Sequence, residues 1–79
     1  MIDIPRDCRV AEVQVSDTSL HVTLHDGREI SVSVSRFPRL QNASAEQRAY
    51  WQPAAAGFGI HWPLIDENLS VDGLLRMER

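Results

Sequence analysis

The fold of this chain is decided by residues 13–34, which read VQVSDTSLHVTLHDGREISVSV. Apolar and polar residues alternate here in three runs, and polar stretches typical of turns separate the runs. Because successive side chains of a strand point to opposite faces, this pattern predicts an antiparallel meander of three strands with one buried face. The apolar positions of the three runs are Val13, Val15, Leu20, Val22, Leu24, Ile30, Val32 and Val34.

The second turn of this meander contains an Asp-Gly pair, and the parity of the strands decides its length. A two-residue loop would pair Leu24 with Glu29 and place the apolar face of one strand beside the polar face of the next. A three-residue loop pairs Val22 with Ile30 instead, and it requires Gly27 to adopt the left-handed conformation of a G1 bulge. We therefore expect the three-residue loop.

Beyond residue 35 the pattern changes to that of one capped helix. Ser44 and Gln47 fit a capping box, which predicts a helix over about 45–51. Pro53 restricts the residue before it and ends this helix. Its inner face is expected to carry Ala49, Tyr50 and Trp51.

A further short strand and a short C-terminal helix complete the predicted fold. Residues 57–62 read as the strand, which ends before Pro63, and Ser70 is expected to cap a helix over about 71–77. The sequence thus predicts a single α+β domain over residues 1–79. The apolar residues of the further strand are expected to close the core, and they are Phe58, Ile60 and Trp62.

The composition narrows the classes of function. The chain has 79 residues and a net charge of −3, and its eight basic residues are scattered arginines, so direct nucleic-acid binding is disfavoured. A lone cysteine, Cys8, excludes an intramolecular disulfide and favours a cytoplasmic location. Residues 1–5 show no signal-peptide pattern, and no apolar run reaches the roughly 20 residues of a membrane span.

The residues that could carry chemistry do not form a recognisable catalytic or metal-binding motif. His21 and His25 are expected on one face of a strand about 13 Å apart, too far to share one metal ion. His61 precedes Asp66 and Glu67, but no nucleophile motif accompanies it. The sequence therefore points to no catalytic residue, no cofactor and no metal.

The corner around His61 and Trp62, together with Asp66 and Glu67, is the candidate protein-binding site. Tryptophan is enriched among the residues that dominate binding at protein interfaces. Two interpretations of Trp62 stay open at this point, and the favoured one is that the ring fills the core of so small a domain.

Several blocks of the chain together resemble the bacterial domain-of-unknown-function family DUF2442. The most specific are residues 60–67, IHWPLIDE, and residues 70–75, SVDGLL. Asn68 departs from the family pattern, which often has a further Asp there, and this weakens an acidic-cluster role. The resemblance implies a small α+β fold, a bacterial or phage source and no established enzymatic activity. It also implies members fused to a helix-turn-helix DNA-binding domain, or standing beside the family DUF4160 in pairs that look like toxin–antitoxin modules.

These observations favour a non-enzymatic protein-binding module, antitoxin-like or regulatory, whose partner is a toxin-like protein. The alternative is a phage-encoded inhibitor, similar to an anti-CRISPR protein, that binds a host nucleic-acid-targeting effector complex. A small enzyme that uses His61 with Asp66 or Glu67 is disfavoured. A homodimer through an open edge of the meander is compatible with the pattern.

Overall fold

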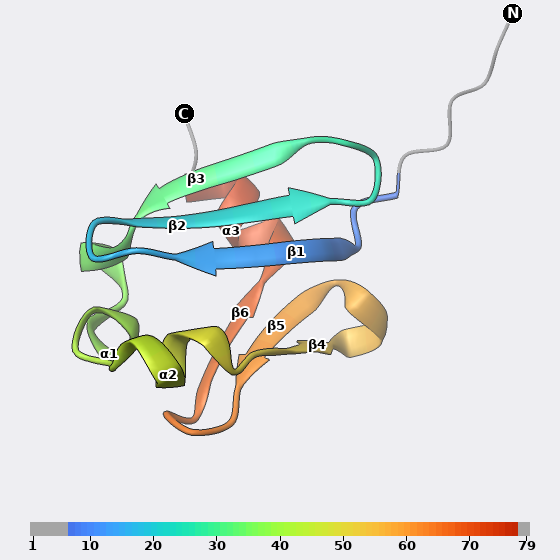
Figure 1. Ribbon diagram of the computed structural model, residues 1–79. Coiled ribbons are helices and arrows are strands. Elements are labelled where there is room, and N and C mark those ends of the chain that lie inside the picture. Colours follow the sequence, from blue (N-terminus) through green and yellow to red (C-terminus); the bar gives the residue numbers. More distant parts are fainter. Residues whose placement is uncertain (1–6, 78–79) are drawn as a thin grey trace, which may run out of the picture.

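Two small antiparallel sheets and several short helices build this protein, and the computed structural model describes residues 7–77 (Figure 1). The strand orders are β1-β2-β3 and β4-β5-β6. The α+β class predicted from the sequence is confirmed. The elements in chain order are β1 (Val10–Val15), β2 (Ser19–Leu24), β3 (Glu29–Ser33), η1 (Val34–Arg36), α1 (Pro38–Gln41), α2 (Ala45–Ala49), β4 (Gln52–Ala54), η2 (Ala55–Gly57), β5 (Gly59–Trp62), β6 (Glu67–Ser70) and α3 (Val71–Met77).

The first sheet has the register that the alternating pattern predicts. Val22 of β2 lies opposite Ile30 of β3. The Leu24 N–H donates to the Arg28 carbonyl at 2.8 Å, which closes a three-residue loop. Gly27 in this loop has a φ of +90°, a conformation that favours glycine. Both the length of the loop and the left-handed glycine are confirmed.

A β-bulge at Ala11 sets which residues at the start of β1 face the core. Val10 pairs with Leu24 and Glu12 pairs with Thr23, so Ala11 is the extra residue of the strand. Continued alternation along β1 would point Ala11 inward. The bulge instead buries Val10 and leaves Ala11 exposed, so the larger apolar side chain fills the core.

The second half of the chain forms a second meander of three strands. The prediction of one further strand corresponds to β5 and missed β4 and β6. β5 pairs with β4 on one side and with β6 on the other. β6 is hard to see in the sequence because Leu69, opposite Ile60, is half-buried, whereas Asn68 and Ser70 are exposed. An edge strand of this kind shows little apolar alternation, and its polar residues resemble those of a loop.

Helix α2 begins where it was predicted and ends two residues early. The Gln47 N–H donates to Ser44 Oγ at 3.1 Å, and the Ser44 N–H donates to Gln47 Oε1 at 2.8 Å, which confirms the capping box. The expected inner face of Ala49, Tyr50 and Trp51 is wrong. Tyr50 is 49% exposed because the chain has already left the helix there, and only Trp51 packs partly against the core.

Phe58 was expected to close the core, and the structure contradicts this. It is 49% exposed, whereas Ile60 and Trp62 are fully buried. The strand begins only at Gly59, and Phe58 is the capping residue that follows η2, with a φ of −92° and a ψ of 9°. The alternation of the strand therefore does not extend to Phe58.

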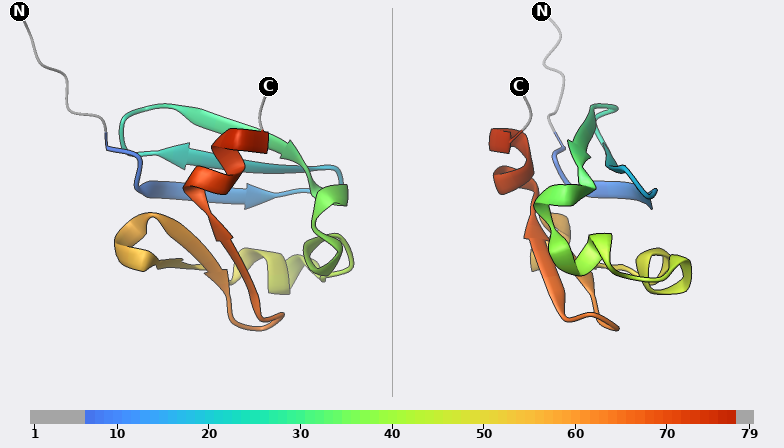
Figure 2. Two further views of the ribbon diagram at one scale, coloured as in Figure 1. Left: turned by 180° about the vertical axis from the view of Figure 1, so that it is seen from behind. Right: turned by 90° about the vertical axis from the view of Figure 1, so that its left-hand side faces the viewer.

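The core lies between the first sheet, α1, β5 and α3. Figure 2 shows α3 across one face of the first sheet, while the second sheet lies beyond the β1 edge. Ser70 Oγ accepts the Gly73 N–H at 2.9 Å, so the predicted cap of the last helix is confirmed. The buried apolar residues are Val10, Val13, Leu20, Val22, Leu24, Ile30, Val32, Val34, Phe37, Leu40, Ile60, Trp62, Val71 and Leu74.

The variant Gly27→Ala is expected to lower the free energy of unfolding by about 1 kcal/mol. The cost is backbone strain alone, because a side chain at Gly27 would meet no atom within 4 Å. Gly27→Asn is the matched control and is expected to cost less, since asparagine tolerates the left-handed region. Urea unfolding measures both. A Gly27→Ala protein as stable as the wild type would contradict the three-residue loop.

Candidate functional site

The predicted protein-binding corner is built from β5, β6 and the turn between them. Trp62 is fully buried, and its indole N–H donates to the Arg48 carbonyl at 3.1 Å. The ring therefore belongs to the core and has no exposed surface for a partner. His61 is half-buried, and its Nδ1 lies 3.2 Å from the backbone carbonyl of Glu67.

The two acidic residues of this corner are engaged locally. Asp66 has a φ of +53° in the exposed turn, and its backbone carbonyl accepts a hydrogen bond from the Arg39 guanidinium at 2.6 Å. Glu67 Oε1 accepts the Asn68 N–H at 3.0 Å. The structure thus joins His61 to the backbone of Glu67, and among residues 7–77 no carboxylate forms an ion pair with its ring. A partner contact through His61, Asp66 and Glu67 stays a prediction.

The histidines of the first hairpin lie on the exposed side of the molecule. His21 and His25 are both exposed, and Nε2 of His21 lies 3.5 Å from Ser31 Oγ. In the described part of the chain, no three His, Cys, Asp or Glu side chains come together as a metal-binding group.

Two Asp-x-Arg pairs lie side by side at one end of the first sheet. Hydrogen bonds from the Arg9 guanidinium, at 2.8 and 2.7 Å, hold the pKa of Asp7 well below its usual range. The backbone N–H and guanidinium of Arg28 likewise lower the pKa of Asp26. Arg28 also donates to Cys8 Sγ at 2.9 Å. Both arginines therefore have internal acidic partners.

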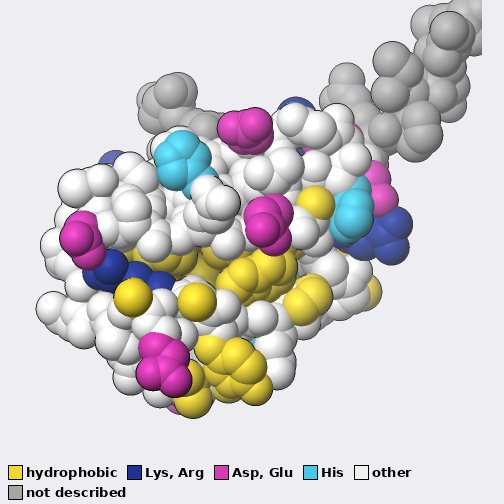
Figure 3. Space-filling view, viewed as in Figure 1, with side chains coloured by type: hydrophobic (Ala, Val, Ile, Leu, Met, Phe, Trp, Pro, Cys, Tyr) yellow, Lys and Arg dark blue, Asp and Glu magenta, His cyan; other side chains and the backbone are white. Residues whose placement is uncertain are grey.

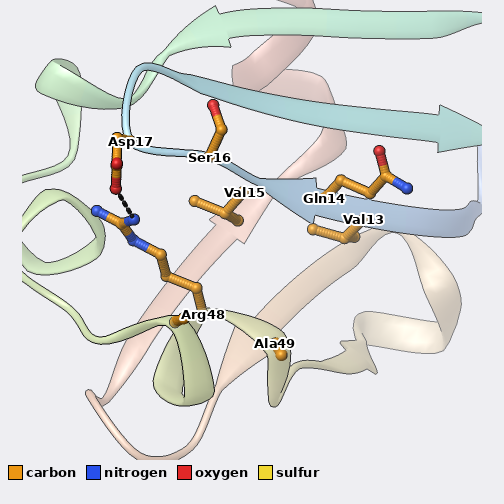
Figure 4. A pocket seen from close by; sticks show the side chains of 8 residues that line it. Val13, Gln14, Val15, Ser16, Asp17, Arg48 and Ala49 are labelled. Atoms are coloured by element: carbon orange, nitrogen blue, oxygen red, sulfur yellow. Dashed lines mark hydrogen bonds and ion pairs between the residues drawn. The ribbon is translucent and has the colours of Figure 1, made fainter.

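A groove that the sequence patterns did not indicate runs between β1 and α2 (Figure 4). Its volume is about 480 Å³. Val15 lies on the β1 side, and Ala45 and Ala49, one helical turn apart on α2, lie on the other. The lining residues are Val13, Gln14, Val15, Ser16, Asp17, Ala45, Arg48 and Ala49.

Arg48 crosses one end of the groove and fixes α2 in place (Figure 4). Its side chain is only 10% exposed. Nε donates to the Leu40 carbonyl at 2.9 Å, and Nη2 donates to the Gln41 carbonyl at 2.8 Å. Nη1 contacts the Asp17 carboxylate at 2.8 Å. The guanidinium thus satisfies two carbonyls at the end of α1 and ties α2 to the first hairpin turn.

The backbone of β1 points into this groove at alternate residues. The Ser16 N–H donates to the Ser19 carbonyl at 2.9 Å. Hydrogen-bonded and non-bonded pairs alternate along an antiparallel ladder, so the backbone of Gln14 bonds to β2 as that of Ser16 does. The backbone N–H and C=O groups of Val13 and Val15 therefore point away from β2. Within residues 7–77, the backbone groups of Val13 and Val15 find no partner on this outer side.

The other sheet edges in residues 7–77 differ in what their outer backbone offers a partner. On β4, Pro53 has no N–H to offer. On β6, the Asn68 N–H is already bonded to the Glu67 carboxylate. β3 begins with the charged Glu29, and α3 packs against it across the face of the sheet rather than along its outer edge (Figure 2). β1 also carries a bulge at Ala11 and the charged Glu12, but among the edges of the described residues it is the one that borders the groove to α2.

The fold and the groove together define a small α+β domain of two antiparallel meanders with an open strand at one sheet edge. The chain belongs to the family DUF2442, described as a protein of unknown function, which matches residues 10–79. The resemblance found in the sequence is therefore confirmed. A crystal structure of a protein of unknown function from Rhodospirillum rubrum ATCC 11170 is similar, with a TM-score of 0.71 and 27% identity over 86% of this chain and 84% of that chain. No curated protein matches this chain.

The helices of the described residues are short. None of the helices in residues 7–77 is both long enough and apolar enough to cross a bilayer. Residues 1–5, for which the sequence indicates no signal peptide, lie outside the described residues. The cytoplasmic location stays a prediction.

Arg48→Ala is expected to lower the free energy of unfolding by about 2–3 kcal/mol, because the Gln41 carbonyl loses its donor, the Leu40 carbonyl is left with the Ala43 N–H, and a largely buried stem is removed. Asp17→Asn is the control and is expected to change stability by less than about 1 kcal/mol, since Asp17 is 95% exposed. Guanidinium unfolding curves compare the two. Equal losses would show that the ion pair, rather than the bonds to Leu40 and Gln41, carries the effect.

Proposed function

We propose that this protein is a non-enzymatic protein-binding module that accepts an extended segment of a partner protein as an additional strand along β1. The carrying observation is the outward backbone of Val13 and Val15 above the groove to α2. In strand addition, main-chain hydrogen bonds supply affinity and side-chain pockets supply specificity. The groove combines an open main chain on β1 with a surface of side chains beside it.

The role that we propose is antitoxin-like or regulatory. A partner segment held along β1 is ordered and covered, so the partner loses the use of that segment. Small size is no obstacle, because an edge strand with its groove needs only the surface of β1 and α2. A toxin-like protein is the partner class that we expect.

Two proline variants of β1 test this mode of binding. Val15→Pro removes an N–H that points outward, so the protein is expected to fold with a loss of about 1–2 kcal/mol while losing its partner. Gln14→Pro is the matched control. It removes an N–H that bonds to β2, and a loss of about 3 kcal/mol or more is expected.

Circular dichroism and urea unfolding check the folding of both variants, and affinity capture from the encoding organism followed by mass spectrometry checks binding. A folded Val15→Pro protein that captures the same partner as the wild type would contradict strand addition at β1. Capture of a host nucleic-acid-targeting complex by the wild type would instead favour the inhibitor alternative.

A further inference from the structure

We infer that the segment bound along β1 is extended and basic, with small apolar side chains alternating with Lys or Arg. This inference rests on the proposed strand addition and adds the chemistry of the partner. It follows from the shape of the groove, the charges around it and the engagement of Arg48.

The shape of the groove suits one extended chain. Helix α2 lies across the groove from β1 (Figure 4), and Ala45 and Ala49 line the groove on the α2 side. Alanine side chains project less into the groove than larger residues would, and a strand added to β1 would lie about 4.8 Å from it. Val13 and Val15 supply an apolar wall, so small apolar side chains of the partner fit here better than large ones.

The charges around the groove are acidic. Asp17 lines it, Glu12 precedes the first lining residue of β1, and Glu46 follows Ala45 on α2. All three acidic residues are exposed. Figure 3 shows acidic side chains around a band of hydrophobic surface on this face of the molecule. Basic side chains alternating with the apolar ones would therefore meet carboxylates along the rim.

Arg48 is the basic residue that lines the groove, but its guanidinium is not free to bind an acidic partner. Arg48 donates to the carbonyls of Leu40 and Gln41 and contacts Asp17. A partner carboxylate would have to replace one of these internal bonds. The site therefore discriminates against acidic segments.

A second copy of this chain is expected to bind the β1 edge more weakly than a basic segment, because the second copy is also acidic. Each copy carries a net charge of −3. Pairing of two β1 strands would bring Glu12 and Asp17 of both copies to one interface, and like charges placed together there weaken association. Self-association is thus an outcome that the experiment must detect.

Fluorescence anisotropy with three capped synthetic peptides of about eight residues tests the inference. One alternates Lys with Val, one Gln with Val and one Glu with Val. The Lys peptide is expected to bind the wild type about tenfold more tightly than the Gln peptide, with an advantage that shrinks as salt is added, and the Glu peptide is expected not to bind.

Charge variants separate the rim from general attraction to an acidic protein. Glu12→Gln with Glu46→Gln is expected to weaken binding of the Lys peptide about tenfold. The control removes two charges elsewhere, Glu29→Gln with Asp72→Asn, and is expected to change it less than about twofold. Equal weakening by both pairs would overturn the assignment of the rim.

The outcomes also separate this inference from the proposed function. If the Gln peptide binds as tightly as the Lys peptide and Val15→Pro abolishes both, the basic partner is wrong and strand addition stands. If Val15→Pro binds the Lys peptide like the wild type, both are wrong. A dimer of the wild-type protein in sedimentation that Val15→Pro dissolves would replace the basic partner with a second copy.

Discussion

Arg48 joins α2 to three other parts of this small protein: α1, the first hairpin turn and β5. Its carbonyl accepts the indole N–H of the buried Trp62, and its guanidinium bonds the last carbonyls of α1 and reaches Asp17 in the first hairpin. Helix α2 buries no side chain completely, so these bonds rather than an apolar face hold it in place. A domain of this size has a limited core and depends strongly on such contacts.

The position of α2 explains the open edge of β1. A helix packed by an apolar face would lie close to the strand and cover it. Alanines and a polar tether hold α2 near β1 and leave a groove between them. The side chain of Val13 packs into the core, and the outer backbone of β1 faces α2 across the groove.

The first sheet could be predicted from the sequence because burial of one face allows one register. The pairing of Val22 with Ile30, the loop with Gly27 and the two serine caps are local or follow from parity. The bulge at Ala11, β6 and the bonds of Arg48 could not be predicted this way. They depend on contacts between distant segments, and a half-exposed strand leaves little periodic signal.

For the candidate site, too, the sequence predicted local features but not those that depend on long-range packing. The sequence directs attention to residues 57–70, where unusual side chains gather, yet Trp62 fills the core and Glu67 bonds the next residue. The groove lies beside β1 instead. Whether the outer edge of β1 is open depends on which distant segments pack next to it, and the local sequence does not show this. Alternating valines on β1 and the alanine spacing of α2 were the available signals, and both are common in ordinary packing.

Native-state hydrogen exchange along β1 tests the central claim most directly. The amides of Val13 and Val15 are expected to exchange much faster than those of Gln14 and Ser16, which bond to β2. Equal and strong protection at all four amides would show that the outer side of β1 is already paired, and it would contradict an open edge.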